Sequence, residues 1–185
     1  MMDNDVTPAV PMEALKAQGI AAFRQGNLPA AEEAFDQALS VLQLGDDRAG
    51  QAEMLVNLGV VHIQSRRFEQ SEKELTRALE IFRVLGRRSE EAQVLGNLGT
   101  LYERAGKSER ARPNYQAAAS IFGELGEKEN QQATLAALTR LQVGQHQWLQ
   151  SLFTYEQMLA TGQKLTLKQR VFRWLFKLVS KLMRW

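Results

Sequence analysis

Apolar side chains recur at steps of three and four residues along most of the chain, the spacing that one face of an α-helix produces. Between residues 55 and 82 they form two such segments, which a short polar turn separates. Comparable turns lie at 25–27, 65–67 and 105–107. A glycine suited to a helix C-terminus follows the second segment of each pair, at Gly45, Gly86 and Gly126. The pattern predicts paired antiparallel helices of roughly 14–18 residues each.

The same pattern returns at a fixed interval, the one that separates Gly59 from Gly99, and we call this interval the repeat period. Four positions recur with it. They are occupied by Gly19, Gly59, Gly99 and Thr139; by Ala31, Ser71, Ala111 and Ser151; by Phe35, Leu75, Tyr115 and Tyr155; and by Ala38, Ala78, Ala118 and Met158. The first three copies are strong and the fourth is degraded. Small residues at a fixed period predict places where two helix backbones approach closely, while the large residues fill the gaps between them.

Two copies carry a recognisable motif. Leu95-x2-Leu98-Gly99-x2-Tyr102 is followed by Ala111-x3-Tyr115, and Leu55-x2-Leu58-Gly59-x2-His62 is close to it. These residues resemble the tetratricopeptide repeat. The usual length of that repeat is about 34 residues, which is shorter than the interval from Gly59 to Gly99 in this chain. The longer form with Asn-Leu-Gly is similar to the repeats of kinesin light chains and of bacterial peptide-sensing regulators. HEAT repeats approach this period but lack the Leu-Gly and Ala signature.

The resemblance implies an all-α solenoid of four helix hairpins that form a right-handed superhelix. The predicted repeats span residues 12–47, 48–87, 88–127 and 128–160, after a flexible N-terminus at 1–11. In such a solenoid the first helix of each hairpin lines the concave face.

The resemblance also implies a binding site for a protein or peptide on that face. In the Asn-Leu-Gly subset, the Asn pairs with the backbone of a bound peptide, and Asn57 and Asn97 hold this position here, with Ala17 and Ala137 in the outer copies. A carboxamide suits the task because it both donates and accepts hydrogen bonds. An alternative is that both Asn side chains bond to the backbone of neighbouring repeats. Further candidates project to the same face, and Arg104 and Arg140 suit a carboxylate: Arg24, Val60, Gln64, Thr100, Glu103, Arg104 and Arg140.

The residues predict no enzyme, cofactor or metal site. The chain has no cysteine and two histidines. His62 replaces the Tyr of the repeat motif and is interpreted as a packing residue, whereas His146 falls in the turn of the fourth copy. Neither a catalytic triad, nor metal-ligand spacing, nor a phosphate-binding glycine loop is found.

Charge divides the chain into two parts. Residues 1–160 hold 16 Lys or Arg against 21 Asp or Glu, a balance of −5, whereas residues 161–185 hold seven basic residues and no acid. Residues 161–166 suggest a linker. Thr166-x-x-Gln169 is a capping-box pattern that predicts a basic amphipathic helix over 167–185. Its candidate contact residues are Arg170, Phe172, Arg173, Trp174, Phe176, Lys177, Lys181, Arg184 and Trp185.

Three interpretations of this C-terminal segment stay open. A wide apolar face with a basic stripe favours an anionic membrane surface. The segment could instead cap the solenoid or join copies of the chain into a homo-oligomer, which would make this a self-assembling structural protein. It could also bind another partner, with nucleic acid disfavoured because the aromatics do not alternate with the basic residues. The N-terminus lacks the apolar core of a signal peptide, and no apolar stretch reaches about 18 residues, so the sequence predicts a cytoplasmic protein, peripheral at the inner face of a membrane if the segment binds lipid.

Overall fold

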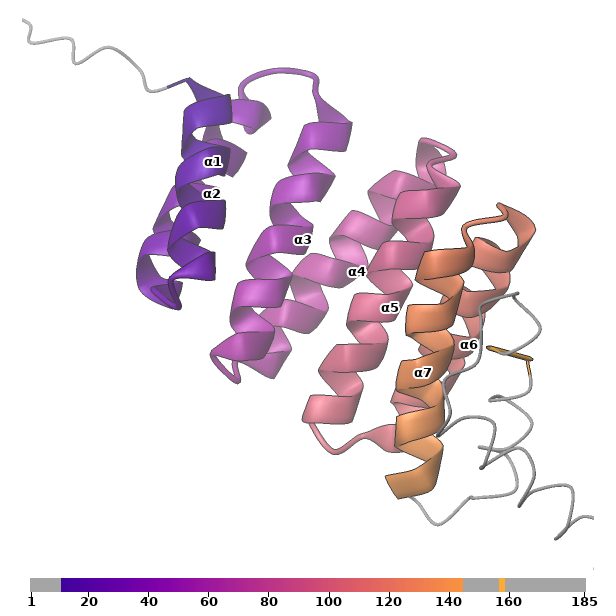
Figure 1. Cartoon of the computed structure of the whole chain (residues 1–185). Coiled ribbons are helices and arrows are strands. Elements are labelled where there is room, and N and C mark those ends of the chain that lie inside the picture. Colours follow the sequence, from indigo (N-terminus) through magenta and orange to yellow (C-terminus); the bar gives the residue numbers. More distant parts are fainter. Residues whose placement is uncertain (1–10, 145–156, 159–185) are drawn as a thin grey trace, which may run out of the picture.

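The computed structural model describes residues 11–144 and 157–158, and its first range consists of seven helices joined by short turns (Figure 1). They are α1 (Met12–Arg24), α2 (Leu28–Gln43), α3 (Arg48–Gln64), α4 (Phe68–Val84), α5 (Arg88–Arg104), α6 (Ser108–Glu124) and α7 (Lys128–Gly144). No strand occurs within residues 11–144. The prediction of an all-α fold is confirmed for this range. His146 and the predicted basic helix at 167–185 lie outside the described residues.

One turn type closes each helix hairpin. Gly26, Arg66 and Gly106 have φ angles of 76°, 60° and 72°. In each turn the next backbone N–H donates to the carbonyl five residues earlier, at 2.8 to 2.9 Å. This bond satisfies a carbonyl that the helix end would otherwise leave unpaired. The turns therefore repeat with the sequence period, although the second one uses an arginine where the others use glycine.

The connection between the first two repeats has a different turn from the later connections. Gly86 and Gly126 adopt φ angles of 67° and 72° after α4 and α6, as expected for glycines that end helices. Gly45 also follows the end of α2 and its C-cap residue Leu44, as predicted, but its φ is not positive. Its place is shifted by one residue, because Asp46 stands one repeat period before Gly86. Here the Asp47 side chain begins the next helix by accepting a 2.8 Å hydrogen bond from the Gly50 backbone N–H.

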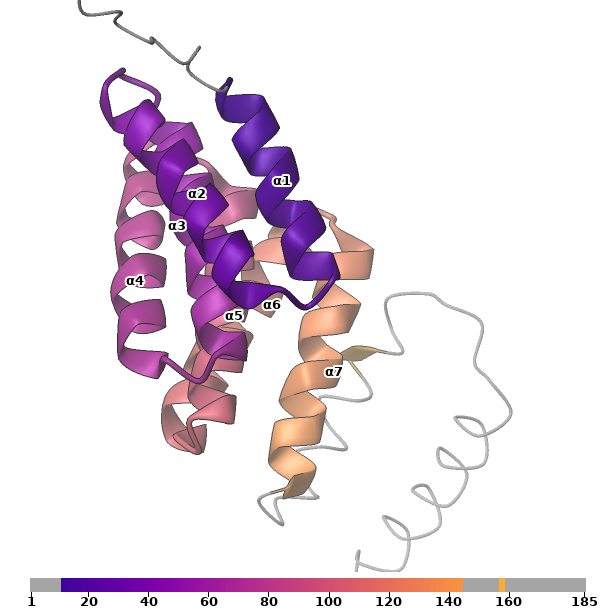
Figure 2. The ribbon, with the colours of Figure 1, turned by 90° about the vertical axis from the view of Figure 1, so that its left-hand side faces the viewer.

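The helices stack in sequence order and form two layers. Each helix contacts the next along the chain, and α3 also contacts α5. The first helices of the hairpins (α1, α3, α5 and α7) lie on one side and the second helices (α2, α4 and α6) on the other (Figures 1 and 2). We call the outer surface of α1, α3, α5 and α7 the first-helix face.

The core confirms the predicted ladders of small and large residues in the first three repeats. Gly19, Gly59 and Gly99 face Phe35, Leu75 and Tyr115, and an added Cβ atom would lie only 2.5 to 2.7 Å from those side chains. The partner positions on the second helices are fully buried at Ala38, Ala78 and Ala118. Each hairpin is therefore held by a large side chain seated on a bare stretch of helix backbone.

Candidate functional site

The first-helix face contains a groove between α5 and α7. It has a volume of about 340 Å³, and it is lined by uncharged residues from three helices: Gln93, Gly96, Asn97 and Thr100 of α5, Tyr115 and Phe122 of α6, and Asn130, Ala133, Thr134 and Ala137 of α7. Two predicted site residues, Asn97 and Thr100, lie in this lining. The other residues that line the groove were not predicted from the sequence.

Asn57 and Asn97 hold equivalent positions in the middle of α3 and α5. Both are half-buried, and neither carboxamide has a hydrogen-bond partner among residues 11–144. The alternative that they bond to the backbone of neighbouring repeats does not describe this structure. Both carboxamides therefore keep their hydrogen-bonding groups free of the described side chains and backbone.

The other predicted residues form pairs between neighbouring repeats. Arg104 Nη1 donates a 2.7 Å hydrogen bond to Gln64 Oε1, so its charge meets a neutral amide. Arg140 instead forms an ion pair with Glu103, with 3.2 Å between Nε and Oε1. The predicted carboxylate contact therefore rests on Arg104, because the charge of Arg140 is already matched.

The remaining predicted residues are Thr100, Val60 and Arg24. Thr100 Oγ1 donates to the Gly96 carbonyl at 3.1 Å and lies 3.1 Å from the Tyr115 hydroxyl. The Tyr115 hydroxyl itself donates to Glu103 Oε2 at 2.7 Å. Burial is the main cause that raises the pKa of Tyr115, and the hydrogen bond to Glu103 raises it further. Val60 is half-buried on α3, and Arg24 is exposed at the end of α1. Thr100, Glu103 and Arg140 therefore belong to one connected group, in which Tyr115 links Thr100 to Glu103. Arg24 is not part of this group.

A buried polar joint connects the first two repeats. His62 is 5% exposed, and its ring nitrogens lie 2.6 Å from Glu74 Oε2 and 3.0 Å from Glu32 Oε1. Arg67 binds both oxygens of Glu32. Hydrogen bonds from Arg67, and then from His62, lower the pKa of Glu32 to about 2, whereas the Glu74 carboxylate raises the pKa of His62. The interpretation of His62 as a packing residue is confirmed.

The next pair of repeats carries the equivalent joint. Tyr102 stands one repeat period after His62, and Glu72 stands one repeat period after Glu32. The Tyr102 hydroxyl donates to Glu72 at 2.9 Å, and the guanidinium of Arg110 lies 4.1 Å from the centre of the tyrosine ring. A side chain on the first helix of one repeat therefore binds a carboxylate on the second helix of the preceding repeat.

Comparison with known proteins agrees with this architecture. The family model described as tetratricopeptide repeat matches residues 12–83 and 50–124. The chain belongs to the tetratricopeptide repeat family. This confirms the resemblance that the Leu-Gly motifs indicate. A search among curated proteins finds no match.

Solved tetratricopeptide repeat structures share the fold. BtubC (BKLC) from P. vanneervenii has a TM-score of 0.74 at 21% identity, over 84% of this chain and 66% of that one. The nearly identical TPR-like repeats of a putative kinesin light chain from Podosopora anserina give 0.69 at 14% identity, over 85% and 78%. A Rap protein complexed with competence and sporulation factor gives 0.52 at 17% identity, over 81% and 53%. The chain thus spans less than two thirds of the first and third of these proteins.

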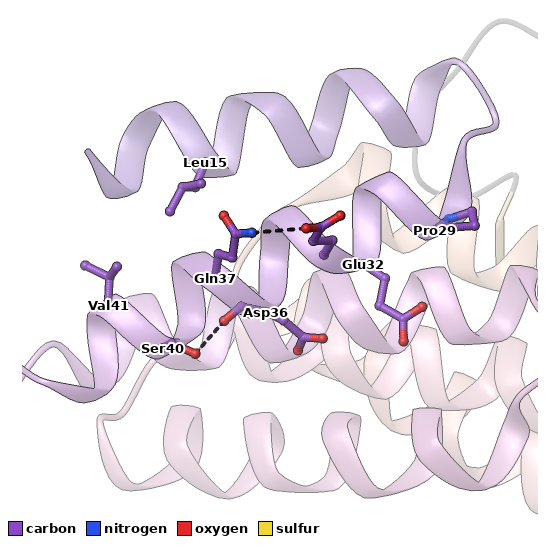
Figure 3. Close-up of a pocket in the computed structure, with 8 residues that line it drawn as sticks. Leu15, Pro29, Glu32, Asp36, Gln37, Ser40 and Val41 are labelled. Carbon is purple, nitrogen blue, oxygen red and sulfur yellow. Dashed lines mark hydrogen bonds between the residues drawn. The ribbon is translucent and has the colours of Figure 1, made fainter. Parts of the chain in front are cut away.

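A second cleft of about 680 Å³ lies at the first tetratricopeptide repeat and was not predicted (Figure 3). Leu15 of α1 and Val41 of α2 contribute apolar surface, and Glu32, Glu33 and Asp36 make the cleft acidic. Glu32 belongs to the polar joint already described. Glu33 accepts a 3.3 Å hydrogen bond from Gln37, while burial, and then the charge of Glu32, raises the pKa of Asp36.

Metal-ligand clusters and membrane-spanning helices are both absent from the described residues. No group of three or more His, Cys, Asp or Glu residues among them could hold a metal ion. No helix among them is long and apolar enough to cross a membrane. The candidate membrane or partner contacts, from Arg170 to Trp185, lie outside the described residues.

A signal for part of the missed groove was present in the sequence. Gly96 occupies the position of Lys16 and Val56 in the earlier repeats, so aligning the repeats exposes a loss of side-chain volume there. The contribution of α6 and α7 to the walls carries no such signal, because it depends on how successive hairpins stack.

Proposed function

We propose that this protein is a non-enzymatic scaffold whose first-helix face binds an extended peptide segment of a client protein. The observation that carries the proposal is the pair of unpaired, half-buried carboxamides at Asn57 and Asn97. An extended peptide presents N–H and C=O groups alternately, and a carboxamide can pair with both. The two Asn residues are separated by one repeat period, which matches a ligand that continues from one repeat to the next.

The charge of Arg104 supports a peptide that carries an acidic group. Arg104 lies at the C-terminal end of α5 and donates its hydrogen bond to a neutral partner, Gln64. An acidic side chain or a terminal carboxylate of the peptide would supply a matching negative charge. Such charge-assisted hydrogen bonds are stronger than neutral ones.

The test uses a phage-displayed library of random dodecapeptides selected on the full chain. The tightest selected peptide is labelled and titrated by fluorescence anisotropy. The double substitution Asn57→Ala with Asn97→Ala should weaken binding by about tenfold for each carboxamide, on the order of a hundredfold together, because each loses hydrogen bonds to the peptide. Helicity should stay unchanged.

The matched control is Thr76→Ala with Gln116→Ala, two exposed positions one repeat period apart on the second helices. This control should bind the peptide like the unsubstituted chain. The proposal is wrong if no peptide is enriched, or if the Asn and control variants bind equally well.

We also propose that residues 167–185 bring the scaffold to an anionic membrane surface. The support is compositional: six basic residues and no acid within this segment, beside a body whose balance is −5. Each Lys or Arg near anionic lipid contributes about 1 kcal/mol. Apolar side chains that enter the interface add to this.

Flotation of the full chain with vesicles containing phosphatidylserine tests this attachment. Floating should require the anionic lipid and should decline when Arg170, Arg173, Lys177 and Lys181 are replaced by Gln. If the full chain stays unbound at low salt, the membrane proposal fails. A particle mass above that of one chain, measured by light scattering, would then favour the alternative, in which the segment joins copies of the protein.

A further inference from the structure

We propose that the groove between α5 and α7 is a specificity pocket that takes one bulky, uncharged side chain of the bound peptide, and that Gly96 creates the room for it. This inference rests on the proposed peptide-binding function. It adds the chemical class of one peptide residue and the residue of this chain that selects it.

Gly96 is the observation that leads to the pocket. Glycine inside a helix is less stable than alanine, so a glycine there usually has a structural reason. Gly59 and Gly99 have one, because an added Cβ would collide with Leu75 or Tyr115. At Gly96 an added Cβ would meet no atom within 4 Å, and its φ lies outside the positive range. Neither the packing nor the backbone of the described residues accounts for this glycine.

The space beside Gly96 belongs to the groove. Gly96 lines it on α5, and Ala133 and Ala137 line it on α7, so small residues face one another across the opening. Phe122 of α6 contributes apolar surface. A volume of about 340 Å³ lies near the lower end of the range for small-molecule sites, so one large side chain has ample room there.

The lining selects against charge. None of the residues that line the groove is acidic or basic. The nearby carboxylate of Glu103 is already engaged by Tyr115 and Arg140. A charged peptide side chain would lose water without gaining a counter-ion, which is costly. An uncharged side chain avoids this cost.

Asn97 connects the pocket to the peptide backbone. It follows Gly96 directly on α5, and its carboxamide lines the same groove without a hydrogen-bond partner among the described residues. A peptide that pairs its backbone with Asn97 would therefore place an adjacent side chain over the space that Gly96 leaves open.

The experiment uses the full chain and the labelled peptide obtained from the library selection described above. Gly96→Leu should fill the pocket and weaken binding more than about tenfold, since the peptide then loses the burial of one large side chain. Thr76→Leu, an exposed position on α4, serves as the matched control and should bind normally. Replacing the bulky uncharged residue of the peptide by Asp should cost affinity with the unsubstituted chain and cost much less with Gly96→Leu.

A second variant distinguishes a filled pocket from a folding defect. Ala133→Leu fills the same groove from the exposed side of α7 and should reproduce the loss if Gly96→Leu lowers the thermal midpoint. Unchanged affinity in a folded Gly96→Leu or Ala133→Leu variant overturns the inference, as does a selected peptide that depends on a charged residue at this position. If the Asn57→Ala, Asn97→Ala variant still loses binding in that case, the groove function stands and the pocket alone is wrong.

Discussion

Arg66 adopts a left-handed backbone conformation that the equivalent turns give to glycine. Its φ is 60°, beside 76° at Gly26 and 72° at Gly106. This conformation costs a residue with a side chain of order 1 kcal/mol or more. Glycine avoids that strain but has a more flexible unfolded state.

We therefore expect Arg66→Gly to raise the free energy of unfolding by about 0.5–1 kcal/mol. Urea unfolding monitored by circular dichroism measures the change. The converse variant, Gly106→Arg, should lower the stability by a similar amount. A decrease on Arg66→Gly would contradict the strain that we assign to this turn.

The joint around His62 makes stability depend on pH. The Glu74 carboxylate raises the pKa of His62 above 6.5, so its stabilisation is complete below pH 6.5 and disappears as the pH rises through the folded pKa. The pKa of Glu32 is lowered to about 2, so its stabilisation is complete above pH 4.5 and disappears as the pH falls toward 2. Arg67 stays charged throughout, and burial, followed by the charge of Glu32, raises the pKa of Asp36 from 3.8.

The free energy of unfolding should consequently fall as the pH rises above 6.5 and through the folded pKa of His62. His62→Tyr should remove most of this fall, because the hydroxyl of Tyr102 occupies the equivalent joint without titrating in that interval. Urea unfolding at several pH values compares the two proteins. Parallel curves would show that His62 is not the group responsible.

At the scale of the helix, two glycines three residues apart on α5 have opposite structural roles. A Cβ at position 99 would lie 2.5 Å from Tyr115 Cδ1, whereas a Cβ at position 96 meets open space. Gly99→Ala should lower the free energy of unfolding by about 1–3 kcal/mol, since it forces α5 and α6 apart. Gly96→Ala should raise it by up to about 1 kcal/mol.

Thermal and urea unfolding of both variants measure this contrast on one helix. Gly59→Ala, which would place a Cβ 2.7 Å from Leu75 Cγ, is the matched control for the first change. A loss of stability on Gly96→Ala would mean that the glycine has a packing role after all.

For the whole molecule, stacking in sequence order predicts uneven stability. α1 has three buried residues, while α3 and α5 each have eight buried residues and neighbours on both sides. In a repeat array each unit gains stability from its neighbours. Hydrogen–deuterium exchange should therefore be faster in α1 than in α3 or α5. Equal protection of the three helices would contradict this.

The repeat period of the sequence determines the fold because the same side-chain contacts form inside each of the first three hairpins. A glycine, a small residue and a large residue return with every repeat period in the first three copies, and this determines the hairpins and which side chains meet inside them. The Asn-Leu-Gly motif likewise locates Asn57 and Asn97 on the first-helix face.

The tertiary structure decides contacts that run between repeats, since they depend on how one hairpin is rotated against the next. The joint between Glu32 and His62, the walls that α6 and α7 add beside Gly96, and the pairing of Arg140 with Glu103 are of this kind. Periodicity predicts which residues share a face of a helix, but it does not predict which of them form hydrogen bonds or ion pairs with a neighbouring repeat. Only the stacked helices reveal that the two Asn side chains are left unpaired within the described residues.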